Sequence, residues 1–126
     1  MKRNRIVYLT MLAMYVICGV VAARAAEPST TVNGWVLDSA CAFTHNLKKP
    51  ISSECAVNCA KAGSPLVILT DAGTIYWPIS AEMPAKGQNE RLMEYAGKRV
   101  SVTGKVFTKG GAHAIVMDKI ESAAKQ

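Results

Sequence analysis

Three cysteines and one histidine lie within nineteen residues of this small chain: Cys41, His45, Cys55 and Cys59. Their spacing is C-x3-H, then nine residues, then C-x3-C. A four-residue step places two side chains on one face of a helix, one turn apart, so each half predicts a short helix that presents two donors. Three thiolates and one imidazole nitrogen suit zinc or copper(I). We therefore interpret the four residues as a soft-metal site.

A disulfide is the competing interpretation of the same residues. Pairing Cys41 with Cys55 or Cys59 would close a loop of about 15 to 19 residues and stabilise the fold by roughly 3 kcal/mol on the chain-entropy model. Disulfides are common in small exported domains. One thiol would remain after pairing, because Cys18 lies in a segment that we expect to be removed. An unpaired thiol leaves room for a redox role.

Two residues ahead of the cysteines predict where the helices begin. Asp38 can cap a first helix with Cys41 at its third position, and Ser52 can cap a second with Cys55 at the same position and Gly63 beyond its end. A thiol in the first helical turn faces unpaired N–H groups, which favours the thiolate. The charge of Asp38 opposes this at Cys41, so Cys55 is expected to be the more acidic thiol.

Five segments have the composition of strands, at 31–38, 66–70, 74–79, 99–107 and 112–121. Asp71-Ala72-Gly73 predicts a three-residue hairpin loop with Gly73 at positive φ. A short helix is expected over 89–97, with Asn89 as its N-cap and Gly97 past its end. Gly104 predicts a bend or bulge within its strand.

This order predicts a mainly β fold, an OB-like barrel of five strands with a helix between strands 3 and 4. A small open α+β sheet is the alternative. The Cys/His segment 38–63 forms a helical insertion between strands 1 and 2, in a loop that OB-folds use for ligands. A single domain over 32–121 is expected, followed by a tail at 122–126.

Residues 1–25 have the features of a signal peptide. A basic start precedes an apolar run over 6–22, and "ARA" at 23–25 offers a small-x-small cleavage site. A single membrane anchor is the alternative, because the run is near the short end of the spanning range. Cleavage predicts a chain that starts at Ala26 with a flexible leader over 26–31. We expect it in the periplasm or outside the cell, without membrane attachment.

Charge and missing motifs restrict the function. Residues 1–25 carry four of the 15 basic side chains and no acidic one, which leaves 11 basic against 9 acidic, a net charge of +2. This is too little basicity to predict a nucleic-acid partner. No G-x-S-x-G, H-E-x-x-H or phosphate-binding glycine loop is present, so no enzyme is predicted. The expected partner is an unidentified protein or small ligand.

Several segments carry a resemblance: "GWVLDSAC" at 34–41, His45, "CAVNCAKAG" at 55–63, "DAGTIY" at 71–76 and "YAGKRVSVTGKV" at 95–106. On these the chain resembles a widespread group of small exported bacterial proteins. The resemblance covers Gly34 to Ile120 and implies export, an OB-like domain and the C-x3-H…C-x3-C cluster as a unit. It implies no reaction.

Together these observations predict a small exported OB-like domain that binds zinc or copper, with a structural or metal-handling role. A disulfide-stapled module that binds a protein or small ligand is the first alternative. A thiol-redox protein that uses Cys55 is the second.

Overall fold

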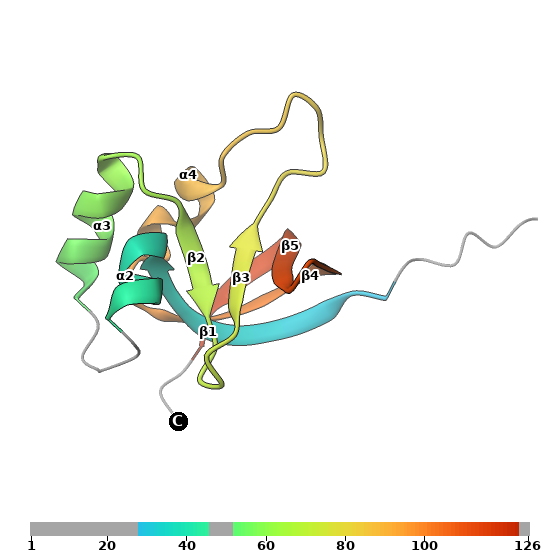
Figure 1. Cartoon of the computed structure of the whole chain (residues 1–126), viewed down its shortest axis with the longest axis horizontal. Coiled ribbons are helices and arrows are strands. Elements are labelled where there is room, and N and C mark those ends of the chain that lie inside the picture. Colours follow the sequence, from blue (N-terminus) through green and yellow to red (C-terminus); the bar gives the residue numbers. More distant parts are fainter. Residues whose placement is uncertain (1–27, 46–51, 124–126) are drawn as a thin grey trace, which may run out of the picture.

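The computed structural model describes residues 28–45 and 52–123. The expected signal peptide, the first leader residues and the last tail residues lie outside this part of the chain. Figure 1 shows the elements, which in chain order are β1 (Thr30–Asp38), α2 (Ser39–Thr44), α3 (Ser53–Lys61), β2 (Leu66–Leu69), β3 (Ile75–Pro78), α4 (Asn89–Leu92), a 3-10 turn (Met93–Tyr95), β4 (Arg99–Lys109) and β5 (Ala112–Ser122).

The five strands close into a barrel in the order β1-β2-β3-β5-β4, so the predicted five-stranded barrel is confirmed and the open sheet is wrong. Neighbouring strands are antiparallel except β3 and β5, which run parallel. The β4–β5 register shifts between Thr103 and Gly104, where a bulge was expected. A bulge bends its strand and increases the local twist, and here it lies in one of the two longest strands of the closed barrel.

Apolar side chains form two layers, one inside the barrel and one outside it. The inner layer takes residues from the strands and from α3 and α4, namely Val32, Val36, Ala60, Leu66, Ile68, Leu92, Val100, Val102, Ile115 and Met117. The outer layer joins Leu37, Val67 and Leu69 to Ala42 of α2. β2 contributes to both layers, so all four of its residues are buried. This explains why its sequence is a continuous apolar run rather than an alternating one.

The segment between β3 and β4 differs from the expected helix over 89–97. α4 ends at Leu92 and is followed directly by the 3-10 turn. Its N-cap is Gln88. The prediction that Asn89 caps the helix is wrong because its side chain bonds elsewhere: it accepts from the Leu66 N–H at 2.8 Å and donates to the Ser64 carbonyl at 2.8 Å. Leu92 is fully buried in the inner layer.

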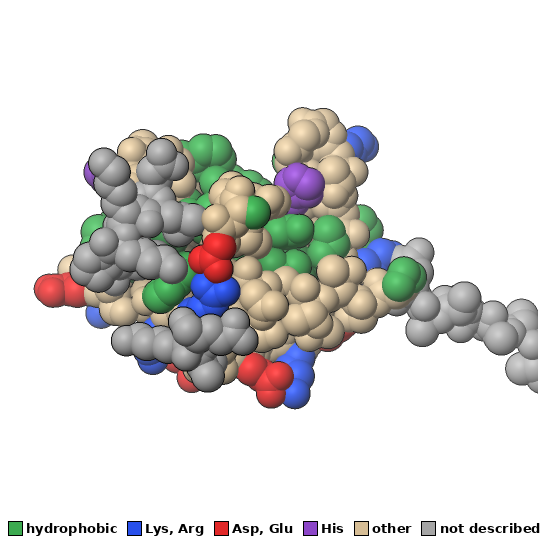
Figure 2. Space-filling model, turned by 90° about the horizontal axis from the view of Figure 1, so that it is seen from below, with side chains coloured by type: hydrophobic (Ala, Val, Ile, Leu, Met, Phe, Trp, Pro, Cys, Tyr) green, Lys and Arg blue, Asp and Glu red, His purple; other side chains and the backbone are tan. Residues whose placement is uncertain are grey.

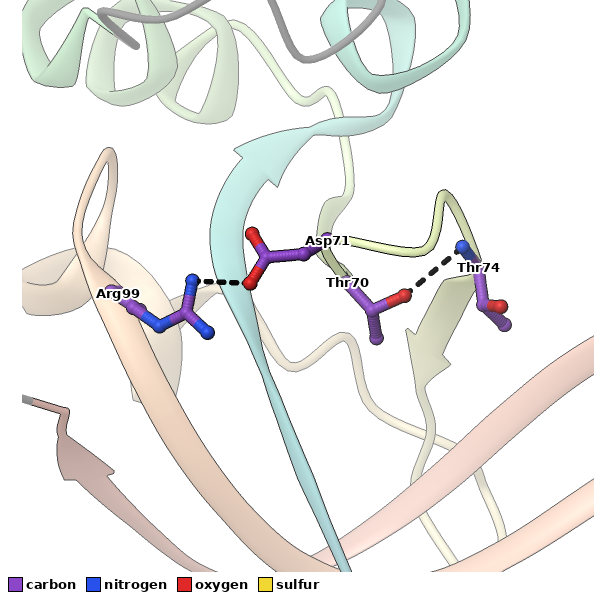
Figure 3. A network of polar contacts seen from close by, with 4 residues as sticks. All are labelled: Thr70, Asp71, Thr74 and Arg99. Carbon is purple, nitrogen blue, oxygen red and sulfur yellow. Dashed lines mark hydrogen bonds and ion pairs between the residues drawn. The ribbon is translucent and has the colours of Figure 1, made fainter. Parts of the chain in front are cut away.

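The β2–β3 loop has the predicted hairpin geometry. Gly73 has a φ of +86°, and its N–H donates to the Thr70 carbonyl at 3.0 Å. The Thr74 N–H donates to the Thr70 hydroxyl at 3.1 Å. Figure 3 shows this contact beside an ion pair of 2.7 Å between Arg99 and Asp71. The pair connects the start of β4 to the loop across β1, which lies between β2 and β4 in the barrel.

Candidate thiol site

The first site helix begins where β1 ends, at Asp38. The carboxylate of Asp38 accepts a hydrogen bond from the Cys41 N–H at 3.2 Å, through Oδ2. Asp38 is therefore the N-cap of α2 with Cys41 in the first turn, as predicted. Only 1% of Asp38 is exposed. The cap thus fixes the direction in which α2 leaves the barrel.

The second site helix is capped at both ends by hydrogen bonds between residues close in the sequence. The Ser52 hydroxyl accepts from the Cys55 N–H at 3.1 Å, which confirms Ser52 as the N-cap of α3. At the other end Gly63 has a φ of +101° and donates to the Ala60 carbonyl, while the Ser64 N–H donates to the Cys59 carbonyl at 3.0 Å. These two bonds form a Schellman motif. The predicted end of the helix is confirmed.

The two helices bring Cys41 of α2 and Cys55 of α3 together. α2 and α3 lie side by side at one end of the barrel (Figure 1), and the Sγ atoms of Cys41 and Cys55 are 4.0 Å apart. A disulfide bond measures about 2.05 Å, whereas two thiolates on one tetrahedral zinc lie about 3.8 Å apart. Cys41, Cys55 and Cys59 all have free thiols. The observed separation is therefore close to that of two thiolates on a shared ion.

His45 is the residue at which the first site helix ends. It is the C-cap of α2 with φ −106° and ψ 7°, its side chain is exposed, and its N–H donates to the Cys41 carbonyl at 3.0 Å. This bond joins residues four apart, as in an α-helix, so His45 follows Cys41 by one turn. Within residues 28–45 and 52–123, no group of three or more His, Cys, Asp and Glu side chains is placed so that it could hold a metal ion.

The carboxylate and the thiols influence one another's protonation. Burial raises the pKa of Asp38, but hydrogen bonds from Cys41, Ser64 and Ala40 outweigh it and hold the pKa below its usual value. The hydrogen bond to Asp38, burial and the charges of Asp38 and Cys55 raise the pKa of Cys41 to about 12. Asp38 thus opposes the Cys41 thiolate, as expected.

Cys59 is affected in the same direction. Burial and the charge of Asp38 raise its pKa, and contacts with Cys55 add to the effect. A thiol whose pKa is raised is a poor nucleophile at neutral pH, because the thiolate is the reactive form. Cys41 and Cys59 are therefore poorly suited to thiol exchange, whereas a bound cation would favour their deprotonation.

The sequence predicts Asp38 as a helix cap whose charge opposes the Cys41 thiolate, but it does not indicate that the carboxylate also contacts Ser64. Its Oδ2 accepts from Cys41 and, at 3.4 Å, from the Ser64 hydroxyl. Its Oδ1 has no hydrogen-bond partner among the described residues. The pattern "WVLDSAC" could have pointed to this residue, because an aspartate ends an otherwise apolar strand three residues before a cysteine.

A hollow of about 460 Å³ lies beside α2 on the outer face of the barrel. Phe43 of α2, Trp77 of β3 and His113 of β5 line it together with glycines of the β2–β3 and β4–β5 turns. Figure 2 shows hydrophobic side chains on its floor next to a histidine. The rings of Phe43 and Trp77 have centroids 6.3 Å apart. No charged side chain lines the hollow among the described residues.

Comparison of the chain with models of known families, with curated proteins and with solved structures finds no match. The resemblance to small exported bacterial proteins therefore stays a prediction. Among the described residues, no helix combines the length and the apolar composition needed to cross a membrane.

Proposed function

We propose that the protein is a small exported domain that binds a soft metal ion through the thiolates of Cys41, Cys55 and Cys59. The observation that supports this most directly is the 4.0 Å separation of the Cys41 and Cys55 sulfurs. It arises from two helices that are capped independently, by Asp38 and by Ser52. The sequence predicts His45 as the fourth donor.

The metal would be zinc or copper, and its role would be structural or in metal handling. Thiolates are the side chains that prefer these ions. Neither α2, with six residues, nor α3, with nine, is long enough to be stable alone. An ion shared by Cys41 and Cys55 would join the two helices at their first turns.

We propose in addition that the barrel is of the OB type. The strand order, the position of α4 between β3 and β4, and the placement of α2 and α3 between β1 and β2 support this assignment. The thiol site would then occupy the loop between strands 1 and 2 that OB-folds use for ligands. The short α4 is the main departure from the expected pattern.

Metal content and free thiols of the protein from its native host test this function. Purified without chelator or reductant, the chain should begin at Ala26 and carry about one zinc or copper ion. After denaturation in chelator it should show three free thiols, because bound thiolates are protected from pairing. Absence of metal with a single titratable thiol would establish the disulfide instead. Intact Met1 in washed membranes would contradict export with cleavage.

A second candidate function is the binding of a small uncharged ligand in the hollow beside α2. The wall of Phe43 and Trp77 favours a flat apolar ring, and the absence of charged lining residues within the described ranges favours a neutral molecule. A disulfide between Cys41 and Cys55 would then fix α2 and its Phe43 against the barrel. This corresponds to the stapled binding module, and quenching of Trp77 fluorescence by such a ligand would support it.

A further inference from the structure

Three glycines of two turns border the hollow beside α2. Gly73 of the β2–β3 loop and Gly110 and Gly111 of the β4–β5 turn all line it. A Cβ at any of the three positions would meet nothing within 4 Å. Because glycine has no side chain, the atoms with which these residues line the hollow are backbone atoms. Peptide groups, each with one donor and one acceptor, are therefore accessible from the hollow along this border.

The β4–β5 turn does not itself require a residue without a side chain at its first position. The last pair of the two strands is Lys109 with Ala112, and Gly110 and Gly111 between them have φ of +58° and +80°. A two-residue type I′ turn needs positive φ at both positions, and Asn-Gly meets this need as well as Gly-Gly does. The peptide group that joins Gly110 to Gly111 lies between the residues of the last pair and takes no part in the ladder.

The hollow also has an aromatic wall. Phe43 of α2 and Trp77 of β3 line it, with ring centroids 6.3 Å apart and ring planes 37° from parallel. A third ring does not fit between them, because each stacking contact takes about 3.5 to 4 Å. A ligand ring would therefore lie on the open side of this wall, where Phe43 is 67% exposed.

We propose that the hollow binds a neutral aromatic lactam, which is a flat ring system with a carbonyl and an N–H on one edge. Its face would lie on Phe43 and Trp77, and its edge would bond to the peptide groups of the bordering glycines. This rests on the second candidate function, because it names the ligand class of the same hollow. The volume of about 460 Å³ is in the range of small-molecule sites. A charged ligand is disfavoured, since no Lys, Arg, Asp or Glu of the described ranges lines the hollow to offset its desolvation.

Two probes that differ at one ring nitrogen test the ligand class. 2-Quinolone is a neutral two-ring lactam, and 1-methyl-2-quinolone has a methyl group in place of its N–H. We expect the methylated probe to bind the purified chain about three- to tenfold more weakly in calorimetry, which is the effect of one net hydrogen bond. The backbone amide signals of Gly110 and Gly111 in nitrogen-15 NMR spectra should shift when 2-quinolone is added.

Gly110→Asn tests whether the bare turn borders the site. The substitution produces an Asn-Gly turn, so the thermal midpoint should stay the same or rise, but the new side chain stands at the hollow. We expect 2-quinolone to bind this variant at least about tenfold more weakly. Gly87→Asn is the matched control, because a Cβ there also meets nothing within 4 Å and Gly87 does not line this hollow. Its affinity should stay within about twofold of the unsubstituted chain.

The possible failures are distinguishable. Equal affinity for the two quinolones, or unchanged 2-quinolone affinity in Gly110→Asn, would overturn this inference. A chain that binds naphthalene, a two-ring molecule without N–H or carbonyl, but not 2-quinolone would also overturn it while the second candidate function stands. A chain that binds none of the three probes would overturn the second candidate function and this inference together.

Discussion

Gly97 and Gly73 both have positive φ, but only Gly97 lies against another part of the chain. Gly97 has a φ of +75°, and a Cβ there would lie 2.4 Å from the Cα and Oγ of Ser53, at the start of α3. Gly73 has a φ of +86°, and a Cβ there would meet nothing within 4 Å. The first turn of α3 therefore packs closely against Gly97, in the segment that leads into β4.

Alanine substitutions at these two positions should lower the free energy of unfolding by unequal amounts. Gly73→Ala should lower the free energy of unfolding by about 1 kcal/mol, since only the backbone conformation is penalised. Gly97→Ala should lower it by roughly 3 kcal/mol or more, because the new methyl group also displaces the backbone of Ser53. Urea denaturation of both variants measures the difference. Equal costs would mean that the first turn of α3 does not pack on Gly97.

Residue-scale predictions from the sequence were accurate where the interaction is local. The caps at Asp38 and Ser52 and the helix end before Gly63 each depend on neighbours within a few residues, so sequence spacing is sufficient. Asn89 resembled a cap for the same reason, yet its side chain bonds to the Leu66 N–H, 23 residues away. No local pattern contains that information.

At the scale of elements, Asn89 joins α4 to the segment that leads out of α3. Its side chain accepts from the Leu66 N–H and donates to the Ser64 carbonyl, both at 2.8 Å, in a half-buried position. The bond to Leu66 satisfies the first N–H of β2. These contacts hold a helix of only four residues in place, which has no cap hydrogen bond from a side chain at its start.

Replacing Asn89 by alanine should therefore lower the free energy of unfolding by about 2 kcal/mol, because it leaves half-buried backbone groups without partners. Asn58→Ala is the matched control. Asn58 is exposed on α3, where alanine is the better helix former, so its effect should lie within about 0.5 kcal/mol. Thermal denaturation followed by circular dichroism compares the two. An Asn89→Ala variant as stable as the control would show that α4 is held by Leu92 alone.

The strands were predictable because the sequence contains segments in which apolar and polar residues alternate and segments rich in β-forming residues. All five strands lie within a few residues of their expected positions. α4 was not, because the segment 89–97 contains one helical turn and then a 3-10 turn that sequence pattern alone does not separate. The insertion helices began at their caps as expected. α2 ends at Thr44, and the His45 N–H still donates to the Cys41 carbonyl four residues earlier, so the expected one-turn spacing of these two residues is kept in the backbone.

At the scale of the whole molecule, the thiol site and the barrel core are separate. The inner layer consists of apolar side chains from the strands, α3 and α4, and no cysteine of the described part of the chain belongs to it. Cys55 is exposed, and Cys41 and Cys59 are half-buried. Each insertion helix contributes one alanine to these layers, Ala42 of α2 to the outer layer and Ala60 of α3 to the inner layer. The barrel thus buries its core whether or not the sulfurs are ligated.

A variant with serine at all three cysteines should consequently fold. We expect Cys41→Ser/Cys55→Ser/Cys59→Ser to keep the far-ultraviolet spectrum of the unsubstituted chain and to bind no zinc. Compared with the metal-free unsubstituted chain, it should lose no more than about 1 to 2 kcal/mol of unfolding free energy, since the thiols are outside the core. Ile115→Ala is the matched core variant and should lose roughly 2 to 5 kcal/mol, because Ile115 is fully buried in the inner layer.

The same variant distinguishes the two roles left open for the metal. In a metal-handling protein, adding zinc should raise the thermal midpoint of the unsubstituted chain only by the mass-action effect of binding, and the serine variant should remain folded without it. In a protein that depends on its metal for folding, removal of the ligands should unfold the chain outright. Because the described residues of the inner layer include no cysteine, we expect the first result. A serine variant that is unfolded at room temperature would show that the insertion is required to hold the barrel together.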